Sequence, residues 1–550
     1  MPQAFDTRRS GGRPGLQETF TIQKIWGKPM LKSLFKAIAV AAVTLTALPA
    51  VAQDDNRPEL VVAVNNLPGS LEGIEEMGNV AVRITYSMYD SLIRRDFLAD
   101  GSGTASKLVP GLAESWERID DRTLELKLRE GVLFHDGSEL TSDDVVFSFN
   151  PARGHGNNPL IGAARRFMLT VSHIEPVDKY TVRVVSKEPD VLLEQRLAGY
   201  AFWVVNAKNY MTVGKDAFAR NPVGTGPYKM DEWVEGEYIR LASHDDYFGG
   251  KPTAKSVTFV QVPEVSARIA GLVSGEYDIS VNIPPDQIPT IESYEDLKVE
   301  RIVLDNTHML VFYTTGPLED KRVRQALSMS IDRKLLRDAL WAGQNYTPNG
   351  HQLPSYTMWI EDYPEFEYNP EKAKELLAEA GYDGEEIVYK FPLNYYLLST
   401  EAAQAMQQMW KAVGLNVKLD PVENFSQVTD ASGTVHIRPW SNTHRMPDPL
   451  GSFVPQWGAD SEVQNNKQVA DRAWDAPAAF NELHNVIVAS TDWDERKRAY
   501  RDALDIWMDE TPGTMLYNPL ETYAMRKGIT WKPYGLYYMD LRPYNLKIGE

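Results

Sequence analysis

Strand patterns and helix patterns are mixed along a chain that is too long for a single hydrophobic core. The chain has 550 residues, whereas single cores stop growing at about 250–300 residues. Residues 123–129 alternate between Leu and polar side chains, and residues 181–184 repeat that alternation with Val. Both patterns predict half-buried strands, and the apolar run 60–64 predicts a fully buried one. The sequence therefore predicts an α/β protein with more than one domain.

Helix signals dominate the second half of the chain. Asn369 is an N-cap residue, Pro370 suits the first helical position, and Gly381 supplies a C-terminal stop. The apolar residues between these signals recur at helical spacing: Ala373, Leu376, Leu377 and Ala380. A similar stripe lies upstream: Val323, Ala326, Leu327 and Ile331.

Residues 30–52 have the pattern of a secretory signal peptide. Two lysines precede the short apolar run 37–48, and Ala50 and Ala52 place small residues at the recognition positions for cleavage. The apolar run is shorter than the roughly 20 residues that a membrane-spanning helix needs. We therefore expect export to the periplasm and cleavage after Ala52, so that the mature chain begins at Gln53.

Residues 1–29 match no targeting pattern. We expect them to be an extension from an upstream start codon, with Met30 as the true start. Removing residues 1–52, which carry seven basic and two acidic side chains, would change the formal charge from -19 to about -24. No later window reaches 18 apolar residues, and we therefore expect a free, soluble product beyond the inner membrane.

The charge and the absence of cysteine exclude several classes of protein. A formal charge of -19 lacks the basic field that nucleic-acid binding usually needs, so we expect no nucleic-acid partner. A chain with 0 Cys has no disulfides, no thiolate metal site, no thiol nucleophile and no lipid anchor on cysteine.

The sequence also lacks the motifs of catalytic and cofactor sites. Neither the G-x-S-x-G elbow nor the G-x-x-x-x-G-K-[ST] phosphate loop occurs, and the Gly-Thr-Gly at 224–226 lacks the third glycine of a dinucleotide fingerprint. The 9 His are dispersed, and none is paired at the i, i+4 spacing of a zinc helix. We expect no catalytic residue, no cofactor and no metal, and a secreted hydrolase is a less favoured alternative.

Several sequence blocks follow one another in a fixed order along the chain. They are LAESWE at 112–117, LREGVLFHDG at 128–137, LTSDDVVFSF at 140–149, PVGTGPY at 222–228, GEYDI at 275–279, and A-x-x-L-L-x-x-A-G-Y at 373–382. Together they resemble the family 5 extracellular solute-binding proteins of bacterial ABC importers, the group that includes dipeptide-, oligopeptide- and nickel-binding proteins. The FHDG and TSDD segments also have structural readings, as a strand that enters a turn and as a helix cap.

The resemblance implies an α/β, two-lobed periplasmic-binding-protein fold whose lobes close on a solute. In this chain the first lobe would comprise 53–306, with an inserted subdomain at about 86–221. The second lobe would comprise 307–519, and residues 520–550 would return to the first lobe.

The resemblance also implies partners and a function. We expect a monomer that captures a small-molecule or peptide ligand and delivers it to the permease and ATPase subunits of an ABC importer, with peptide import as the leading function. A non-peptide solute, such as an oligosaccharide, an opine-like compound or an anionic conjugate, is the alternative.

One loop departs from the pattern of peptide-binding members. Those members carry W-x-x-D-Y-P-D-P in the second lobe, and its first Asp faces the α-ammonium of the ligand. Here the loop begins at Trp440 and ends with Pro-Asp-Pro at 447–449. Counting from Trp440 places Thr443 at the acid position, whereas counting back from Pro-Asp-Pro places Arg445 there. Neither alignment supplies the carboxylate.

Two readings of this loop stay open. In the first, Arg445, together with His444 and Asn442, recognises a carboxylate, phosphate or polyol through its planar donor groups. In the second, Arg445 points to solvent and another acid, such as Asp448, serves the ammonium group. We expect Trp440 to form a stacking wall. The predicted ligand-binding residues are therefore Trp440, Asn442, Thr443, His444, Arg445 and Asp448.

Overall fold

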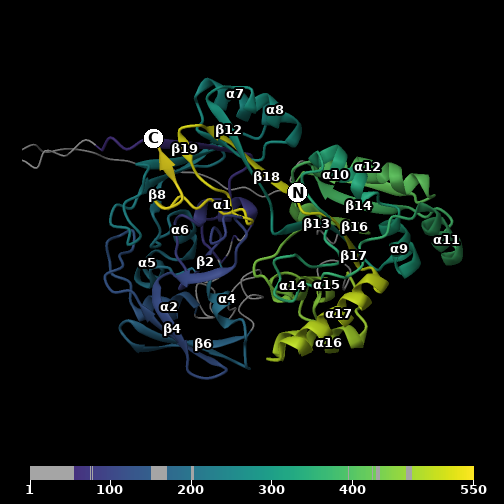
Figure 1. Ribbon diagram of the computed structural model, residues 1–550, viewed down its shortest axis with the longest axis horizontal. Helices are drawn as coiled ribbons and strands as arrows, with labels where there is room; N and C mark the ends of the chain where they lie inside the picture. Colours follow the sequence, from purple (N-terminus) through teal and green to yellow (C-terminus); the bar gives the residue numbers. More distant parts are fainter. Residues whose placement is uncertain are drawn as a thin grey trace, which may run out of the picture. The chain divides into compact units, whose positions relative to one another are not determined.

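Two large β-sheets organise the chain in the computed structural model (Figure 1). The structure describes residues 55–549 except 75, 77, 150–169, 200–202, 394–395, 424, 429–433 and 466–472. The predicted leader at 30–52, the residues before it and the expected cleavage site lie outside the described residues.

The first large sheet has seven strands, in the order β12-β18-β11-β1-β10-β9-β8. Its central strand β1 pairs in parallel with both β10 and β11, and its side chains are largely buried, as the apolar run at 60–64 predicted. The strands are β1 (Glu59–Val64), β8 (Tyr228–Val234), β9 (Tyr238–Ser243), β10 (Ser256–Gln261), β11 (Ile279–Ser280), β12 (Leu297–Val303) and β18 (Leu520–Arg526). Helices α7 (Val265–Ser274) and α8 (Ile288–Glu292) pack beside this sheet.

The second large sheet has five strands, in the order β15-β14-β16-β13-β17. They are β13 (Asn306–Phe312), β14 (Ile387–Pro392), β15 (Val417–Val422), β16 (Ile437–Thr443) and β17 (Gly513–Tyr517). We call the seven-stranded sheet with the elements packed on it the first lobe, and the five-stranded sheet with its helices the second lobe.

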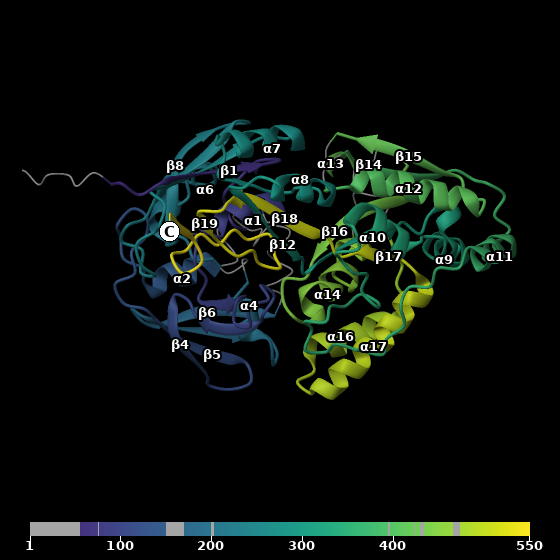
Figure 2. The same cartoon turned by 45° about the horizontal axis from the view of Figure 1, so that its top comes forward.

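Helices cover both faces of the five-stranded sheet in two groups, of which the second lies below it in Figures 1 and 2. The helices of the first group are α9 (Lys321–Met329), α10 (Arg333–Trp341), α11 (Pro370–Ala380) and α12 (Ser399–Ala412); those of the second include α16 (Ala478–Ala489) and α17 (Trp493–Glu510). Strand β13 is buried along its whole length. Leu310 and Phe312 join the core of the first group, whereas Met309 and Val311 join that of the second. Alternate side chains of one strand thus enter two separate cores.

Two short segments connect the lobes, and they lie side by side. Residues 304–305 join β12 to β13, and residues 518–519 join β17 to β18. Leu304 N–H donates to the Pro519 carbonyl at 3.0 Å, and Asn518 Nδ2 donates to the Leu304 carbonyl at 3.1 Å. The exact lobe boundaries given by the sequence stay predictions.

A separate four-stranded sheet lies within the region predicted as the inserted subdomain. Its order is β4-β5-β7-β6, with β4 (Ala113–Arg118), β5 (Thr123–Leu128), β6 (Val171–Asp178) and β7 (Thr181–Ser186). The Leu residues of β5 face the core, so the predicted half-buried strand is confirmed. Helix α2 (Ser142–Phe149) packs on β6 and β7, and Thr141 N–H donates to the Asp144 carboxylate at 3.0 Å, which closes its first turn.

Two of the sequence blocks meet at His135. Its Nδ1 accepts from Gly224 N–H at 3.2 Å, and its Nε2 hydrogen-bonds the Gly226 carbonyl at 3.1 Å. An added Cβ on Gly224 would lie 2.3 Å from the carbonyl oxygen of Met88, so only glycine permits this backbone approach. Burial, together with the neighbouring His244, lowers the pKa of His135 to about 3, so the ring is neutral at pH 7. These two motifs specify the fold.

The helix signals of the second half are confirmed. Helix α11 begins at Pro370, the Asn369 side chain accepts from Lys372 N–H, and Gly381 ends the helix with φ 70°. The stripe beginning at Val323 belongs to α9, but Ile331 lies beyond the end of that helix, where it is still fully buried.

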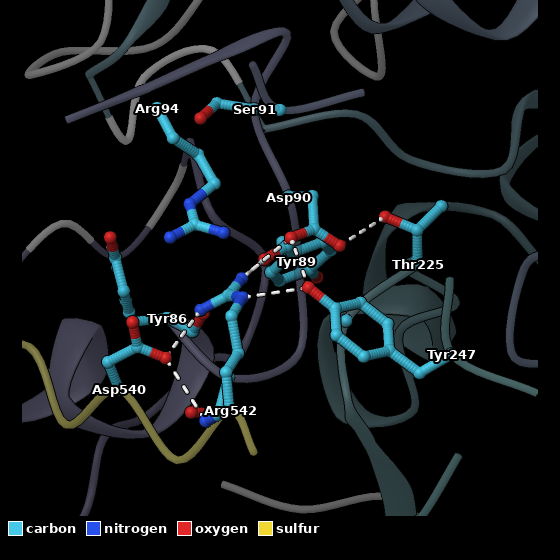
Figure 3. Close-up of polar contacts among 12 residues, drawn as sticks. Tyr86, Tyr89, Asp90, Ser91, Arg94, Thr225, Tyr247, Asp540 and Arg542 are labelled. Atoms are coloured by element: carbon cyan, nitrogen blue, oxygen red, sulfur yellow. Dashed lines mark hydrogen bonds and ion pairs between the residues drawn. The ribbon is translucent and has the colours of Figure 1, made fainter. Parts of the chain in front are cut away.

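The last segment of the chain is anchored in the first lobe by Arg542 (Figure 3). The guanidinium lies between two buried carboxylates, Asp90 and Asp540. Its N–H groups donate to five oxygen atoms: Tyr247 Oη (2.9 Å), Asp540 Oδ1 (2.9 Å), Asp90 Oδ1 (2.7 Å), and the carbonyls of Tyr86 (3.2 Å) and Tyr89 (2.9 Å). We call Asp90, Tyr247, Asp540 and Arg542 the Arg542 cluster.

Candidate functional site

A cavity of about 810 Å³ is lined by residues of both lobes. Its volume falls in the range of about 300–1,000 Å³ that is typical of sites for small organic ligands. The first lobe contributes residues of α1 (Asn79–Thr85), α7 and β18, whereas the second contributes residues of β13 and α12. Pro519, in one of the connecting segments, also lines the cavity. A ligand in this position would contact both lobes.

The first-lobe wall is built around Asn282, whose backbone has a φ of 53°. This left-handed conformation is uncommon outside glycine, although Asn tolerates it better than most residues. Asn282 N–H and Nδ2 donate to the two carboxylate oxygens of Glu521 at 3.1 and 2.9 Å. Its Oδ1 accepts from Arg83 Nη1 at 3.1 Å, and its carbonyl accepts from Arg268 Nη2 at 3.1 Å. We call Arg83, Arg268, Asn282 and Glu521 the Arg83 cluster.

The charged members of the Arg83 cluster are buried, at 2–3% exposure. Burial, reinforced by the neighbouring Arg83, lowers the pKa of Arg268 to about 10. Burial also raises the pKa of Glu521, although Arg83, Asn282 N–H and Arg268 act in the opposite direction. Low exposure makes each unbalanced charge here expensive, so the way these groups are paired matters for what the wall can bind.

Amide side chains and exposed carboxylates make up much of the remaining polar lining. The amides all come from the first lobe: Asn65, Asn66, Asn79, Gln261, Asn282 and Gln287. The exposed carboxylates come from both lobes: Glu264, Asp286, Glu401 and Glu423. An amide both donates and accepts hydrogen bonds, so this lining suits a solute with many polar groups.

The second-lobe wall includes His308 and an adjoining row of aromatic rings. The His308 ring centroid lies 5.1 Å from that of Tyr396, which lies 6.4 Å from that of Phe425. Burial lowers the pKa of His308 to about 3, so the ring is neutral at pH 7. Its Nε2 is buried and has no hydrogen-bond partner among the described residues. His308 thus brings an unsatisfied polar atom to the edge of the cavity.

Trp440, the predicted stacking residue, continues this aromatic row. Its ring centroid lies 6.2 Å from that of Phe425, and the Arg438 guanidinium lies 4.2 Å from the indole centroid. The indole is half-buried in β16. One face is therefore in cation–π range of Arg438, and Phe425 and Tyr396 connect Trp440 to the cavity.

Asn442 and His444 are buried in a hydrogen-bonded network of the second lobe. Asn442 Nδ2 contacts His351 Nε2 at 2.9 Å and donates to Ser452 Oγ at 3.0 Å. The His444 ring lies between Thr307 Oγ1, at 3.1 Å, and Tyr356 Oη, at 2.6 Å. Burial, with His351 nearby, holds the pKa of His444 well below its ordinary value. Both side chains are occupied by protein partners.

Thr443 is one of the two residues that align with the first Asp of the family's W-x-x-D-Y-P-D-P motif, and it connects the two lobes. Its Oγ1 accepts from Asn306 Nδ2 at 2.8 Å and lies 3.4 Å from Asn79 Oδ1 of α1. Asn79 Nδ2 also reaches Ser441 Oγ, at 3.5 Å. Asn79 lines the cavity, so Thr443 adjoins it through a first-lobe side chain.

Arg445 and Asp448 follow on the loop beyond β16. Arg445 is partly buried, its N–H donates to the Gly451 carbonyl at 3.2 Å, and its Nη1 lies 3.5 Å from the Thr443 carbonyl. Asp448 is fully buried, and its carboxylate accepts from Arg496 Nη2 at 3.0 and 3.2 Å. It also accepts from Leu450 N–H at 3.0 Å. Burial raises the pKa of Asp448, although Arg496 opposes that effect.

The six predicted residues lie at the end of β16 and on the loop after it. Thr443 is connected to the cavity through Asn79, and Trp440 through Phe425 and Tyr396. None of these six described residues is part of the cavity lining itself. The lining residues Arg83, His308 and Glu521 were missed by sequence reasoning because no motif marks them. The only local signal is the pair Asn65 and Asn66 directly after a buried strand, since ligands of α/β proteins often bind at the carboxyl ends of strands.

Among the residues that the structure describes, no group of three or more His, Cys, Asp or Glu side chains is arranged to hold a metal ion. Among the described helices, none combines the length and the apolar character needed to cross a bilayer.

Comparison with known proteins identifies relatives of the whole fold. The sequence model of the bacterial extracellular solute-binding proteins, family 5 Middle, matches residues 107–463. The oligopeptide-binding protein AppA of Bacillus subtilis is 27% identical over 445 residues, which cover 76% of this chain and 79% of AppA.

Solved structures share the fold as well. The periplasmic binding protein DppA of Helicobacter pylori, in complex with the peptide STSA, superimposes with a TM-score of 0.79 at 21% identity, over 90% of this chain and 99% of DppA. AgaA of A. tumefaciens R10, in complex with agropinic acid, gives a TM-score of 0.76 at 24% identity, over 90% of this chain and 99% of AgaA. These neighbours have the α/β, two-lobed periplasmic-binding-protein fold that the sequence predicted. The chain belongs to the family 5 bacterial extracellular solute-binding proteins.

Proposed function

We propose that this protein is the substrate-binding component of an ABC importer and captures a peptide in the cavity between its lobes. The observation that carries the proposal is that residues of both lobes line one cavity next to a connecting segment. A ligand that contacts both lobes favours their closed arrangement, because binding shifts the population toward the state it stabilises. The family is one of solute-binding proteins and not of enzymes.

The chemistry of the lining supports a peptide as the solute. A peptide presents backbone amides, an ammonium and a carboxylate, and the cavity offers amide side chains, exposed carboxylates and buried guanidinium groups that complement them. AppA is named for oligopeptide binding, and the DppA structure contains a peptide. We therefore favour peptide import over other solutes.

The residues predicted from the sequence take different parts in this proposal. We assign Trp440 to the aromatic wall, because Phe425 and Tyr396 connect it to the cavity. We assign Asn442, Thr443 and His444 to supporting the end of β16, since their side chains have protein partners. Asp448 supports the loop through Arg496. For Arg445 we favour the reading in which it does not contact the solute, because it lies outside the cavity lining.

The same proposal includes the location of the protein, its oligomeric state and its partners. The protein acts in the periplasm after cleavage behind Ala52, works as a monomer, catalyses no reaction, and docks on permease subunits served by ATPase subunits. Expression with the natural leader in a Gram-negative host, followed by N-terminal sequencing of the periplasmic product, tests the cleavage. A chain that begins at Gln53 supports it, and retention of residues 30–52 contradicts it.

A non-peptide solute is the second candidate, favoured by one observation. Two of the three charged groups in the buried Arg83 cluster are cationic, and the neighbour AgaA contains agropinic acid. An opine-like compound or another anionic solute would also suit such a wall. An oligosaccharide would use the amide side chains alone.

Isothermal titration against three sets of ligands separates these candidates. The sets are di- to tetrapeptides, opines, and oligosaccharides such as maltotriose, each added to protein that has been unfolded and refolded to remove copurified solute. Micromolar binding of peptides alone supports the proposal, since that affinity corresponds to about -8 kcal/mol. Binding of opines or sugars in place of peptides contradicts peptide import and leaves the solute-binding function intact.

A further inference from the structure

We infer that Arg83 forms a subsite for a carboxylate of the solute on the first-lobe wall of the cavity. The inference rests on the proposed function in one respect, namely that the solute occupies this cavity. It goes further by naming the group that binds the ligand and the chemical class that the ligand must contain.

The first-lobe wall of the cavity has an excess of positive charge. The Arg83 cluster holds two guanidinium groups, Arg83 and Arg268, and one carboxylate, Glu521, all buried. Arg83 Nη2 lies 3.5 Å from Glu521 Oε1, which is a long contact for an ion pair. The buried groups of the cluster therefore carry a net charge of +1, and the further carboxylate that acts on Arg268, Glu264, is exposed. A buried excess charge is costly unless a counter-charge joins it.

The two arginines of the cluster differ in their hydrogen bonding. Arg268 makes four bonds, which go to the carbonyls of Val262 and Pro263 (both 2.7 Å), Val281 (3.1 Å) and Asn282 (3.1 Å). These bonds fix Arg268 as part of the wall. Arg83 lines the cavity, and its Nη1 and Nη2 make one bond each, to Asn282 at 3.1 Å and to Glu521 at 3.5 Å, while its buried Nε has no hydrogen-bond partner within the described part of the chain. Because each Nη carries two N–H groups, Arg83 is the cation with donor capacity left for a ligand.

Positive and negative side chains of the cavity lining differ in their exposure to solvent. The cations of the cavity lining are buried, whereas Glu264, Asp286, Glu401 and Glu423 are exposed. A solute with a carboxylate and an ammonium group is held best with the carboxylate at the buried wall and the ammonium toward the exposed acids. This segregation gives the ligand one favoured direction in the cavity and selects a zwitterionic solute over a neutral one.

The size of the excess charge selects among anions. A carboxylate carries a single negative charge and balances a single excess guanidinium. A phosphate dianion would bring a second negative charge close to the buried Glu521, where like charges in a site of low exposure repel. Across the cavity, His308 is a neutral hydrogen-bonding group on the second lobe. The ligand that fits therefore carries a single carboxylate at the end that faces Arg83.

The test uses matched ligands that differ only in the carboxylate. Affinities of tri-alanine and its C-terminal amide, and of N-acetyl-tri-alanine and its amide, are measured by calorimetry for the wild type, Arg83→Lys and Arg83→Gln. A non-peptide set of amino-acid derivatives in acid and amide forms is measured in parallel. Arg445→Gln is the control, since Arg445 is a partly buried arginine outside the lining.

We expect the wild type to bind each acid at least about tenfold more tightly than its amide, because hydrogen bonds to charged groups contribute about 1.5–3 kcal/mol. Arg83→Gln should abolish this preference, Arg83→Lys should retain part of it, and Arg445→Gln should leave it intact. Arg83→Gln leaves Arg268 and Glu521, whose charges balance, so the wall loses its excess charge. If this variant proves unstable, Arg83→Met, which keeps a long side chain without its charge, is measured in its place and should also show no preference.

The outcomes separate the two proposals. Peptides that bind equally well as acids and amides overturn the carboxylate subsite and leave peptide binding in place. An Arg83-dependent preference confined to non-peptide acids supports the subsite and overturns peptide import. A preference lost in Arg445→Gln and kept in Arg83→Gln moves the subsite to the loop after β16 and overturns the inference. No binding of any carboxylate also overturns it.

Discussion

Two buried arginines of the first lobe have opposite surroundings. Arg542 donates from all of its N–H groups to five protein oxygens and lies between two carboxylates (Figure 3). Arg83 lines the cavity, its contact with its one carboxylate is 3.5 Å long, and its Nε has no partner among the residues described. Both side chains are almost inaccessible to solvent.

The difference shows how to tell an anchoring charge from a binding charge. In the Arg542 cluster the carboxylates of Asp90 and Asp540 face Arg542, and the nearby Arg94 supplies a second positive charge. Burial alone would raise the pKa of Asp540, but Arg542 and Arg94 hold it below its ordinary value. Counted with Arg94, that cluster is balanced without a ligand. The buried groups of the Arg83 cluster carry a net charge of +1, and the further carboxylate near Arg268, Glu264, is exposed, so a carboxylate of the solute can supply the buried counter-charge.

The largest expected effect is on stability and comes from Arg542→Gln. The change leaves two buried carboxylates without their main partner, and breaking a buried ion pair typically costs about 3–5 kcal/mol. Urea unfolding followed by tryptophan fluorescence should show a loss of this size in the free energy of unfolding. Arg501→Gln removes an exposed partner of Asp362 and should cost less than about 1 kcal/mol. Equal losses in the two variants would show that the anchoring is unimportant.

Arg83→Gln should destabilise the protein less, by about 2 kcal/mol, the contribution of one hydrogen bond to a charged group. Glu521 keeps both donors of Asn282 and remains near Arg268, so its charge stays partly compensated. The same urea experiment, run on ligand-free protein, compares this loss directly with that of Arg542→Gln. A loss as large as that of Arg542→Gln would mean that Arg83 is an anchor as well, and the contrast would fail.

A smaller effect should appear in the pH dependence of stability. Burial raises the folded-state pKa of Glu521 above the ordinary value of 4.5, so the folded state holds this proton more tightly than the unfolded state does. The resulting stabilisation is complete below pH 4.5 and is lost as the pH rises through the folded-state pKa. The free energy of unfolding of the wild type minus that of Glu521→Gln should fall across this window. A difference that rises with pH would mean that Arg83 and Arg268 hold the folded-state pKa of Glu521 below its ordinary value.

The smallest effect is expected from Arg445→Ala, which should change the affinity for tri-alanine by less than about threefold, or about 0.7 kcal/mol. Arg445 lies outside the cavity lining, and its Nη1 contact is a 3.5 Å approach to a backbone carbonyl. Loss of binding in this variant, with a preference for anionic ligands in the wild type, would instead support the reading in which Arg445 recognises the solute.

The sequence predicted those parts of the fold that depend on neighbouring residues. Helix α11 is an example, because its N-cap, its first-turn Pro and its terminal Gly lie within a few positions of its apolar face. The β5 strand could be predicted for the same reason, since its alternation is a local pattern. The family blocks extended these local patterns to the whole two-lobed fold.

The Arg83 cluster could not be predicted in this way. Its members, at 83, 268, 282 and 521, come from α1, α7, a loop and β18, and only the pairing of distant strands brings them together. The loop beginning at Trp440 attracted attention because it departs from a family motif. Yet Asn442 and His444 resemble ligand-binding residues only until their buried partners are known.

Strand β18 has a consequence for the order in which the protein can form. It lies inside the seven-stranded sheet, between β12 and β11, although it comes from the last part of the chain. The first lobe therefore remains split, with exposed strand edges, until nearly the whole polypeptide has emerged from the ribosome. The chain can thus stay unfolded for most of its synthesis, and loss of a few dozen residues from its C-terminus would remove an interior strand of the first lobe and leave the second-lobe sheet complete.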